Sequence, residues 1–108
     1  MILVIIHLIT SCRSDQKSEL SGLEQEKVNL ILILYNYRDS NDTKFPESVD
    51  GLLKWHIGHA GDKSISHIKY GWIYKKPPKS SVNDPDFVIL EKSTSGGDIV
   101  RIRIKDLQ

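Results

Sequence analysis

Two histidines stand at a spacing that could hold a metal ion. His56 and His59 are three positions apart, which places both imidazoles on one face of a helix, and His67 follows in the next segment. Imidazole nitrogens bind zinc and copper, so one hypothesis is a small metal site on these side chains. Zinc sites normally use three or four ligands. The competing interpretation places His56 near a helix end, where the dipole favours it, and His59 in a loop.

This sequence contains no recognisable set of catalytic residues. Gly58 to Ser64 superficially matches a phosphate-binding loop, but Ile57 and Asp62 occupy the positions where that motif requires glycine. No G-x-S-x-G turn occurs that would present a serine nucleophile. We therefore predict a protein that is not an enzyme and that binds no nucleotide.

The overall composition indicates one small globular domain. The chain has 108 residues, of which 39% are hydrophobic and 27% are charged. Lysines and arginines exceed aspartates and glutamates by 15 to 14, a formal net charge of +1 that provides no field for steering toward nucleic acid. Lys75, Lys76 and Lys79 surround the prolines and could face anionic lipid or cell-wall polymer, although such side chains are more often simply solvated.

The amino terminus carries an apolar run, Ile2 to Ile9, interrupted only by His7 and followed by Thr-Ser-Cys12. This pattern indicates an export leader. The run is much shorter than the roughly 20 residues that span a bilayer, so it cannot anchor the chain by itself. Ile9 to Cys12 resembles the lipobox of bacterial lipoproteins, whose cysteine thiol receives a diacylglyceryl group before cleavage. The alternative is a buried, unpaired thiol.

The lipobox resemblance implies a signal peptide at residues 1–11 and a lipid on Cys12, the first residue of the mature protein. Several acyl chains, such as palmitate, anchor a protein durably because each buried methylene contributes about 0.8 kcal/mol. The chain would then be held at a membrane of the cell envelope, facing the periplasm. Arg13 favours the outer over the inner membrane, by analogy with bacteria in which aspartate at this position retains lipoproteins.

A long helix is predicted after a polar tether. Residues 12–19 are expected to form that flexible tether, and residues 20–108 the folded domain. The helix is expected to begin at Ser18 or Ser21, where a capping-box pattern stands, and to continue to about Arg38. Leu30 to Tyr35 is apolar on every side and could equally be a buried strand, but the helical spacing upstream continues through it. If helical, it must be covered on most faces.

The remaining sequence predicts a short helix and three strands. Apolar residues at helical spacing, ended by Gly58 and Gly61, mark the second helix: Val49, Leu52, Leu53 and Trp55. Ile65 to Lys76 is predicted as a half-buried strand, and residues 77–85 as a loop. Phe87 to Lys92 and Ile99 to Lys105 are predicted to form a hairpin around residues 93–98. The expected fold class is α+β, with a three-stranded antiparallel sheet whose apolar face lies on the long spine helix.

Residues 28 to 106 resemble type II secretion pseudopilins and other prepilin-like proteins. The segment Lys44 to Leu53 resembles the one after the family's spine helix, and Asn83 to Glu91 with the final strand resembles its C-terminal hairpin. The family's methylated leader and long apolar first half-helix are missing, and the ending at Lys105 to Gln108 differs from the family's DGH ending. The resemblance implies a pilin-like fold. It also implies a possible calcium site, for which Asp84 and Asp86 could supply oxygens; the competing interpretation is turn chemistry.

These observations leave two functional hypotheses and a third, an enzyme whose site forms only in an oligomer, for which no residue argues. The first is a non-catalytic, lipid-anchored envelope protein whose pseudopilin-like domain binds another protein, in association with a secretion or pilus-like system. Apart from the lipid on Cys12, it needs no cofactor. The second is a small metal-binding lipoprotein that uses His56 and His59, with His67 as a further ligand.

Overall fold

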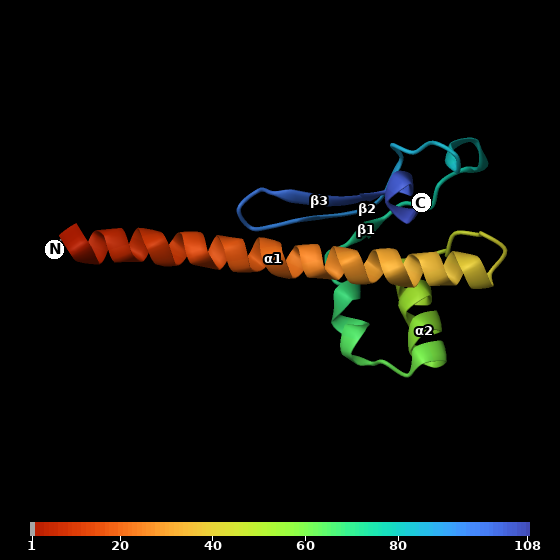
Figure 1. Ribbon diagram of the computed structural model, residues 1–108, viewed down its shortest axis with the longest axis horizontal. Coiled ribbons are helices and arrows are strands. Elements are labelled where there is room, and N and C mark those ends of the chain that lie inside the picture. Colours follow the sequence, from red (N-terminus) through yellow and green to blue (C-terminus); the bar gives the residue numbers. More distant parts are fainter. Residues whose placement is uncertain (1) are drawn as a thin grey trace.

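The protein consists of one long helix, one short helix and a small sheet. The computed structural model describes the backbone of residues 2–108 and the side chains of residues 19–108. Helix α1 spans Ile2–Ser40 and helix α2 spans Val49–Ala60 (Figure 1). Strands β1, β2 and β3 span Ile73–Tyr74, Val88–Ser93 and Ile99–Arg103, and they form a three-stranded antiparallel sheet in the order β1-β2-β3. Short 3-10 helices complete the fold: η1 (Ser64–Lys69), η2 (Lys79–Ser81) and η3 (Ile104–Leu107). The predicted α+β class is confirmed.

Helix α1 is longer than the sequence pattern predicts. It begins at Ile2, so the predicted start at Ser18 or Ser21 is wrong, and residues 12–19, expected to be a flexible tether, are helical. The reason is that this polar segment contains good helix formers and neither glycine nor proline, so a helix propagates through it. The predicted helical state of Leu30 to Tyr35 is confirmed.

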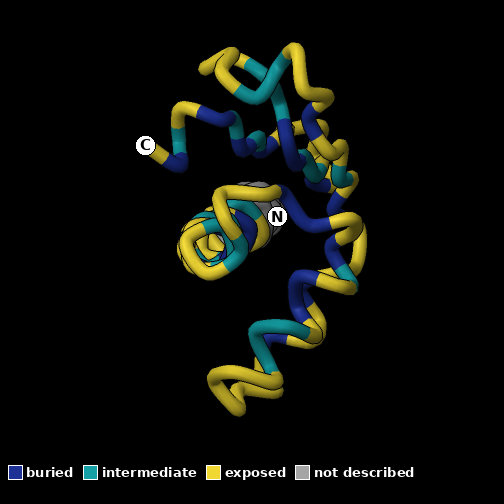
Figure 2. The backbone as a smooth tube through the Cα atoms, turned by 90° about the vertical axis from the view of Figure 1, so that its right-hand side faces the viewer, coloured by how far each residue is buried: buried dark blue, intermediate teal, exposed yellow. Residues whose placement is uncertain are grey.

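The core lies on two sides of α1. Figure 1 shows α1 between the β2–β3 hairpin and α2, and Figure 2 shows the same arrangement along the helix. The buried α1 residues are Leu23, Leu30, Ile33 and Leu34, and they share one hydrophobic cluster with Leu52 and Leu53 of α2 and with Ile89, Leu90, Val100 and Ile102 of the sheet. Burial alternates along β3, because Val100 and Ile102 are buried and Arg101 between them is not. Side chains from two helices and a sheet therefore stabilise one core.

A third side of α1 is left open. Val28, Leu32 and Tyr35 are 59%, 60% and 55% exposed, and we call these three residues the apolar stripe. The expectation that this part of the helix is covered on most faces is therefore wrong for the stripe. The segments that follow α1 cover the sides facing α2 and the sheet, and η3 borders the third side, where the stripe itself stays exposed.

The predicted strand from Ile65 to Lys76 is wrong over most of its length. Ile65 and Ile68 are both buried at a spacing of three, which suits the 3-10 helix η1, and only Ile73–Tyr74 pairs with β2. Gly71 has a φ of +81°, a conformation that interrupts an extended strand. The side chain of Lys92 lies against Gly71 and donates to the carbonyl oxygen of Tyr70 at 3.0 Å, which holds this turn on the sheet.

The two elements with the clearest sequence signals agree with the structure. Helix α2 begins at its N-cap Ser48, whose Oγ accepts from the amide of Gly51 at 3.0 Å, and ends at Gly61, which has a φ of +72°. Gly58 lies within the helix and does not end it. The β2–β3 hairpin pairs Glu91 with Arg101 across the outer face of the sheet. The predicted hairpin is confirmed.

The tip of the hairpin is fixed to α1 by Glu19. Its carboxylate accepts from the Ser95 amide at 2.8 Å and from the Ser95 hydroxyl at 2.6 Å. These hydrogen bonds lower the pKa of Glu19 below its ordinary value of 4.5. Because these bonds favour the ionised carboxylate, their contribution to stability is complete above pH 4.5 and is lost as the pH falls through the lower folded value.

We expect the Ser95 amide resonance to titrate with a midpoint below 4.5. The measurement is an NMR pH titration of wild type and Glu19→Gln, and the variant should lack this transition. Glu24→Gln is the matched control, since Glu24 lies on the same helix and makes no such contact among the described side chains. A Ser95 titration unchanged in Glu19→Gln would contradict the contact, and with it the packing of this part of α1 along the sheet.

Candidate functional site

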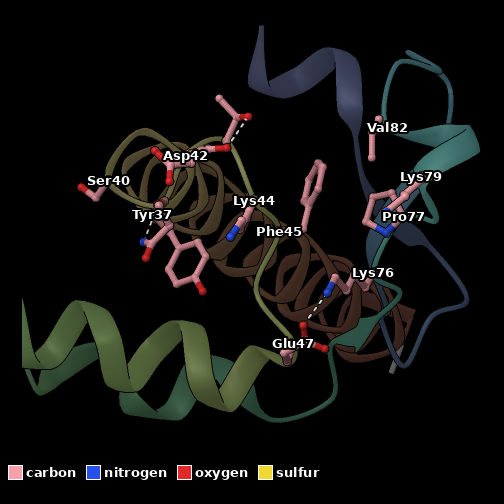
Figure 3. A pocket seen from close by; sticks show the side chains of 12 residues that line it. Tyr37, Ser40, Asp42, Lys44, Phe45, Glu47, Lys76, Pro77, Lys79 and Val82 are labelled. Atoms are coloured by element: carbon pink, nitrogen blue, oxygen red, sulfur yellow. Dashed lines mark hydrogen bonds and ion pairs between the residues drawn. The ribbon is translucent and has the colours of Figure 1, made fainter.

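A pocket of about 620 Å³ lies where α1 ends. Figure 3 shows its lining, with the end of α1 and the α1–α2 loop on one side and residues 76–82 on the other. The lining side chains are Tyr37, Ser40, Asn41, Asp42, Thr43, Lys44, Phe45, Glu47, Lys76, Pro77, Lys79 and Val82. Pockets of about 300–1,000 Å³ are of the size that holds small molecules. Three of these side chains are lysines, so the pocket is lined by positive charge.

The turn that forms one wall of the pocket has an unusual backbone. Asp42 and Thr43 have φ values of +55° and +61°, in the left-handed region that residues other than glycine seldom occupy. The amide of Thr43 donates to the carbonyl oxygen of Arg38 at 2.7 Å, which caps the end of α1. Two side chains hold the turn in place. The Nδ2 of Asn41 donates to the carbonyl oxygen of Tyr37, and the Nε of Arg38 donates to the carbonyl oxygen of Thr43. Left-handed residues commonly end helices, and backbone held in this region also occurs at binding sites.

We expect Thr43→Gly to raise the free energy of unfolding by about 1 kcal/mol, because glycine adopts this φ without the cost that a β-branched residue incurs. Asp39→Gly is the control. Asp39 lies within α1, where glycine should lower the free energy of unfolding by roughly 0.5–1 kcal/mol. Urea unfolding of both variants measures the difference. If both variants were destabilised equally, the strain at Thr43 would be refuted.

Packing and hydrogen bonds fix the other walls of the pocket. The guanidinium of Arg38 lies 4.1 Å from the ring centre of Phe45, and burial lowers its pKa without discharging it. The hydroxyl of Tyr74 donates to the carbonyl oxygen of Pro46 at 2.5 Å, and burial raises the pKa of this phenol. Lys76 forms an ion pair with Glu47 across the mouth of the pocket (Figure 3).

A second surface is the groove beside the apolar stripe. The stripe residues Val28, Leu32 and Tyr35 line it together with Ile31, Leu107 and the chain end. The stripe positions are separated by four and three residues, so they form one line along the helix. This is the spacing with which one amphipathic helix contacts another.

The structure does not bring the three histidines together. His59 lies in the last turn of α2 and not in a loop, and its Nδ1 donates to the carbonyl oxygen of Trp55 at 2.8 Å. His67 lies in η1, where its Nδ1 donates to the carbonyl oxygen of Ser64 at 2.8 Å. Among the side chains of residues 19–108, no group of three histidine, cysteine, aspartate or glutamate residues could hold one metal ion. A site on His56 and His59 stays a hypothesis.

The other predicted site residues have local roles or lie outside the described side chains. The carboxylate of Asp84 accepts from the amide of Asp86 at 3.0 Å, which is turn chemistry, and Asp86 lies 3.8 Å from the Nζ of Lys105. Asp62 accepts from the hydroxyl and from the amide of Ser64 in a similar turn, and these two bonds lower its pKa. The backbone of Cys12 is within α1, but its side chain lies outside the described residues, so its lipidation stays a prediction.

Sequence reasoning missed most of the pocket. The sequence suggested one basic surface made of Lys75, Lys76 and Lys79. Lys76 and Lys79 line the pocket, whereas Lys75 lies over the ring of Phe87, 6.0 Å from its centre. Lys44 gave no sign of a binding role, because it was noted only as the first residue of the segment that resembles the family. The one available hint was the polar run after α1, whose asparagine and aspartate tolerate the left-handed conformation.

Comparisons with protein-family models, with curated proteins and with solved structures find no match to this chain. Within residues 2–108, no helix has both the length and the apolar character required to cross a bilayer.

Proposed function

We propose that this chain is a non-catalytic, lipid-anchored protein of the bacterial cell envelope, and that its folded part binds another protein. In this proposal a lipid on Cys12 holds the chain at a membrane, with the outer membrane favoured over the inner. The domain faces the periplasm and belongs to a secretion or pilus-like system. The single observation that carries the binding function is the exposed apolar stripe on α1.

Within the α+β class, we propose that the fold is pilin-like. Support comes from the order of the elements, which is a long N-terminal helix, a short helix and then an antiparallel sheet that ends in a hairpin. Further support comes from the core, where Leu30 and Leu34 of α1 meet Ile89 and Ile102 of the hairpin. Fold likeness alone carries no function, so the binding role rests on the stripe.

The proposed occupant of the stripe is an amphipathic helix of another envelope protein. Three large apolar side chains in one line cost free energy while they face water, and a partner helix with matching apolar residues would bury them. The groove between the stripe and Leu107 gives that helix a path along α1. A second copy of this chain is the competing occupant.

Chemical cross-linking of intact cells, followed by mass spectrometry, tests the binding function. We expect reproducible cross-links from Lys27, which is next to the stripe, to one other envelope protein. If cross-links formed only between copies of this chain, the proposal that the partner is a different protein would be contradicted. Recovery of no reproducible neighbour would contradict the binding function itself.

The anchor is tested by Cys12→Ser. We expect the wild-type protein in the membrane fraction, with an intact mass that lacks residues 1–11 and includes the mass of acyl chains. The Cys12→Ser variant should remain unprocessed and without lipid, because serine cannot form the thioether. Ser14→Ala is the control and should behave as wild type. A wild-type protein that still begins at Met1 without added lipid would overturn the anchor.

A further inference from the structure

The pocket at the end of α1 combines positive charge with an apolar wall. We propose that it binds a small organic anion in which a phosphate or carboxylate group is attached to a compact apolar body. This proposal is independent of the lipid anchor and of the apolar stripe, because it rests only on the side chains that line the pocket.

Two lysines supply the charge for the anion. Among residues 19–108, neither Lys44 nor Lys79 has a carboxylate within ion-pair distance, although both line the pocket. The third lysine, Lys76, is already paired with Glu47. Two ammonium groups without carboxylate partners favour an anion in the pocket that both line, and each can donate to an oxygen of an anion.

The charge balance favours an anion over a cation. The lining contains three lysines against two carboxylates, those of Asp42 and Glu47, and Lys76 neutralises the second. The C-terminal end of a helix attracts cations through its free carbonyl groups. Here the carbonyl oxygen of Arg38 already accepts from Asn41 and Thr43, and that of Tyr37 accepts from the Asn41 side chain, so this attraction is reduced.

Apolar side chains lie beside these lysines in the lining (Figure 3). Phe45 and Pro77 are buried and Val82 is half-buried, and all three contribute to the cavity. Arg38 covers the face of Phe45, and the Tyr74 bond to Pro46 fixes the adjoining loop, so the apolar wall is held in place before any ligand arrives. A preformed wall reduces the entropy cost of binding. A small ligand can then gain binding free energy from both the lysine charges and the apolar surface.

The test is an NMR titration of the full chain with phenyl phosphate at low salt. We expect saturable shifts of the Thr43, Lys44 and Val82 amides, with a dissociation constant on the order of 1 mM. Inorganic phosphate and phenol should each bind at least about tenfold more weakly, since each lacks one half of the ligand. Benzoate distinguishes a carboxylate from a phosphate as the preferred anion.

The decisive variant is Lys44→Gln combined with Lys79→Gln. We expect about a tenfold loss of phenyl phosphate affinity, because both cationic donors are removed from exposed positions that the fold does not require. The control combines Lys54→Gln with Lys105→Gln, which are exposed lysines paired with carboxylates elsewhere. Circular dichroism checks that each variant is folded. The proposal is overturned by no saturable binding at 10 mM phenyl phosphate (about ten times the expected constant), by equal binding of phenol, or by equal losses in both variants.

Discussion

Leu34→Ala is expected to lower the free energy of unfolding by about 3 kcal/mol, while Leu32→Ala should change it by less than about 1 kcal/mol. The two leucines are two positions apart on α1, and they are 0% and 60% exposed. Leu34 belongs to the cluster shared with α2 and the sheet, so its truncation removes buried methyl groups and leaves a cavity. Leu32 faces water, so its truncation leaves no cavity.

Urea unfolding monitored by circular dichroism measures this difference. The variants are matched, because the substitution, the helix and the change in helix propensity are the same. Equal destabilisation would mean that Leu32 is as buried as Leu34 in the folded protein. That result would contradict the exposure of this face of α1.

Tyr35→Lys should reduce cross-linking to the partner by at least about tenfold, since interface aromatics are often residues whose loss costs 2 kcal/mol or more. Tyr35 is 55% exposed and is the aromatic residue of the stripe. Its position in the later turns of α1 tolerates a positive charge, because the C-terminal half of a helix favours cations. The fold should therefore remain intact while the contact is lost.

The control for this substitution is Tyr70→Lys. Tyr70 is 67% exposed but lies after η1, away from the stripe. Cross-linking yield in intact cells and thermal unfolding of the purified variants are the two measurements. Equal loss of cross-linking in both variants would contradict the stripe as the contact surface, and unfolding of Tyr35→Lys alone would show that Tyr35 supports the core.

Sequence patterns predicted the elements whose signals are local. Apolar residues at helical spacing and Gly61 at the end predicted α2, and the polar turn between β2 and β3 predicted the hairpin. The start of α1 was missed because polar residues without glycine or proline are compatible with both a tether and a helix. The strand at Ile65 to Lys76 was predicted from the alternation of Ile68, Tyr70, Trp72 and Tyr74, and it was wrong because Tyr70 is 67% exposed and Ile68 lies in a 3-10 helix.

The two candidate surfaces could not be predicted for a different reason. The pocket brings Lys44 together with Lys79, and only the path of the chain between them places both on one cavity. The stripe consists of Val28, Leu32 and Tyr35, which are as apolar as their buried neighbours, so the sequence gives no sign of which side stays open. Both surfaces depend on tertiary packing.

The most direct test of the proposed binding function is site-specific photo-cross-linking in living cells. A photoreactive amino acid is placed at Val28, Leu32 or Tyr35, and at Tyr70 or Ile73, which are also exposed and apolar. We predict adducts with one other envelope protein from the three stripe positions and none from the two control positions. Adducts that are equally strong from both sets, or absent from the stripe, would contradict the account.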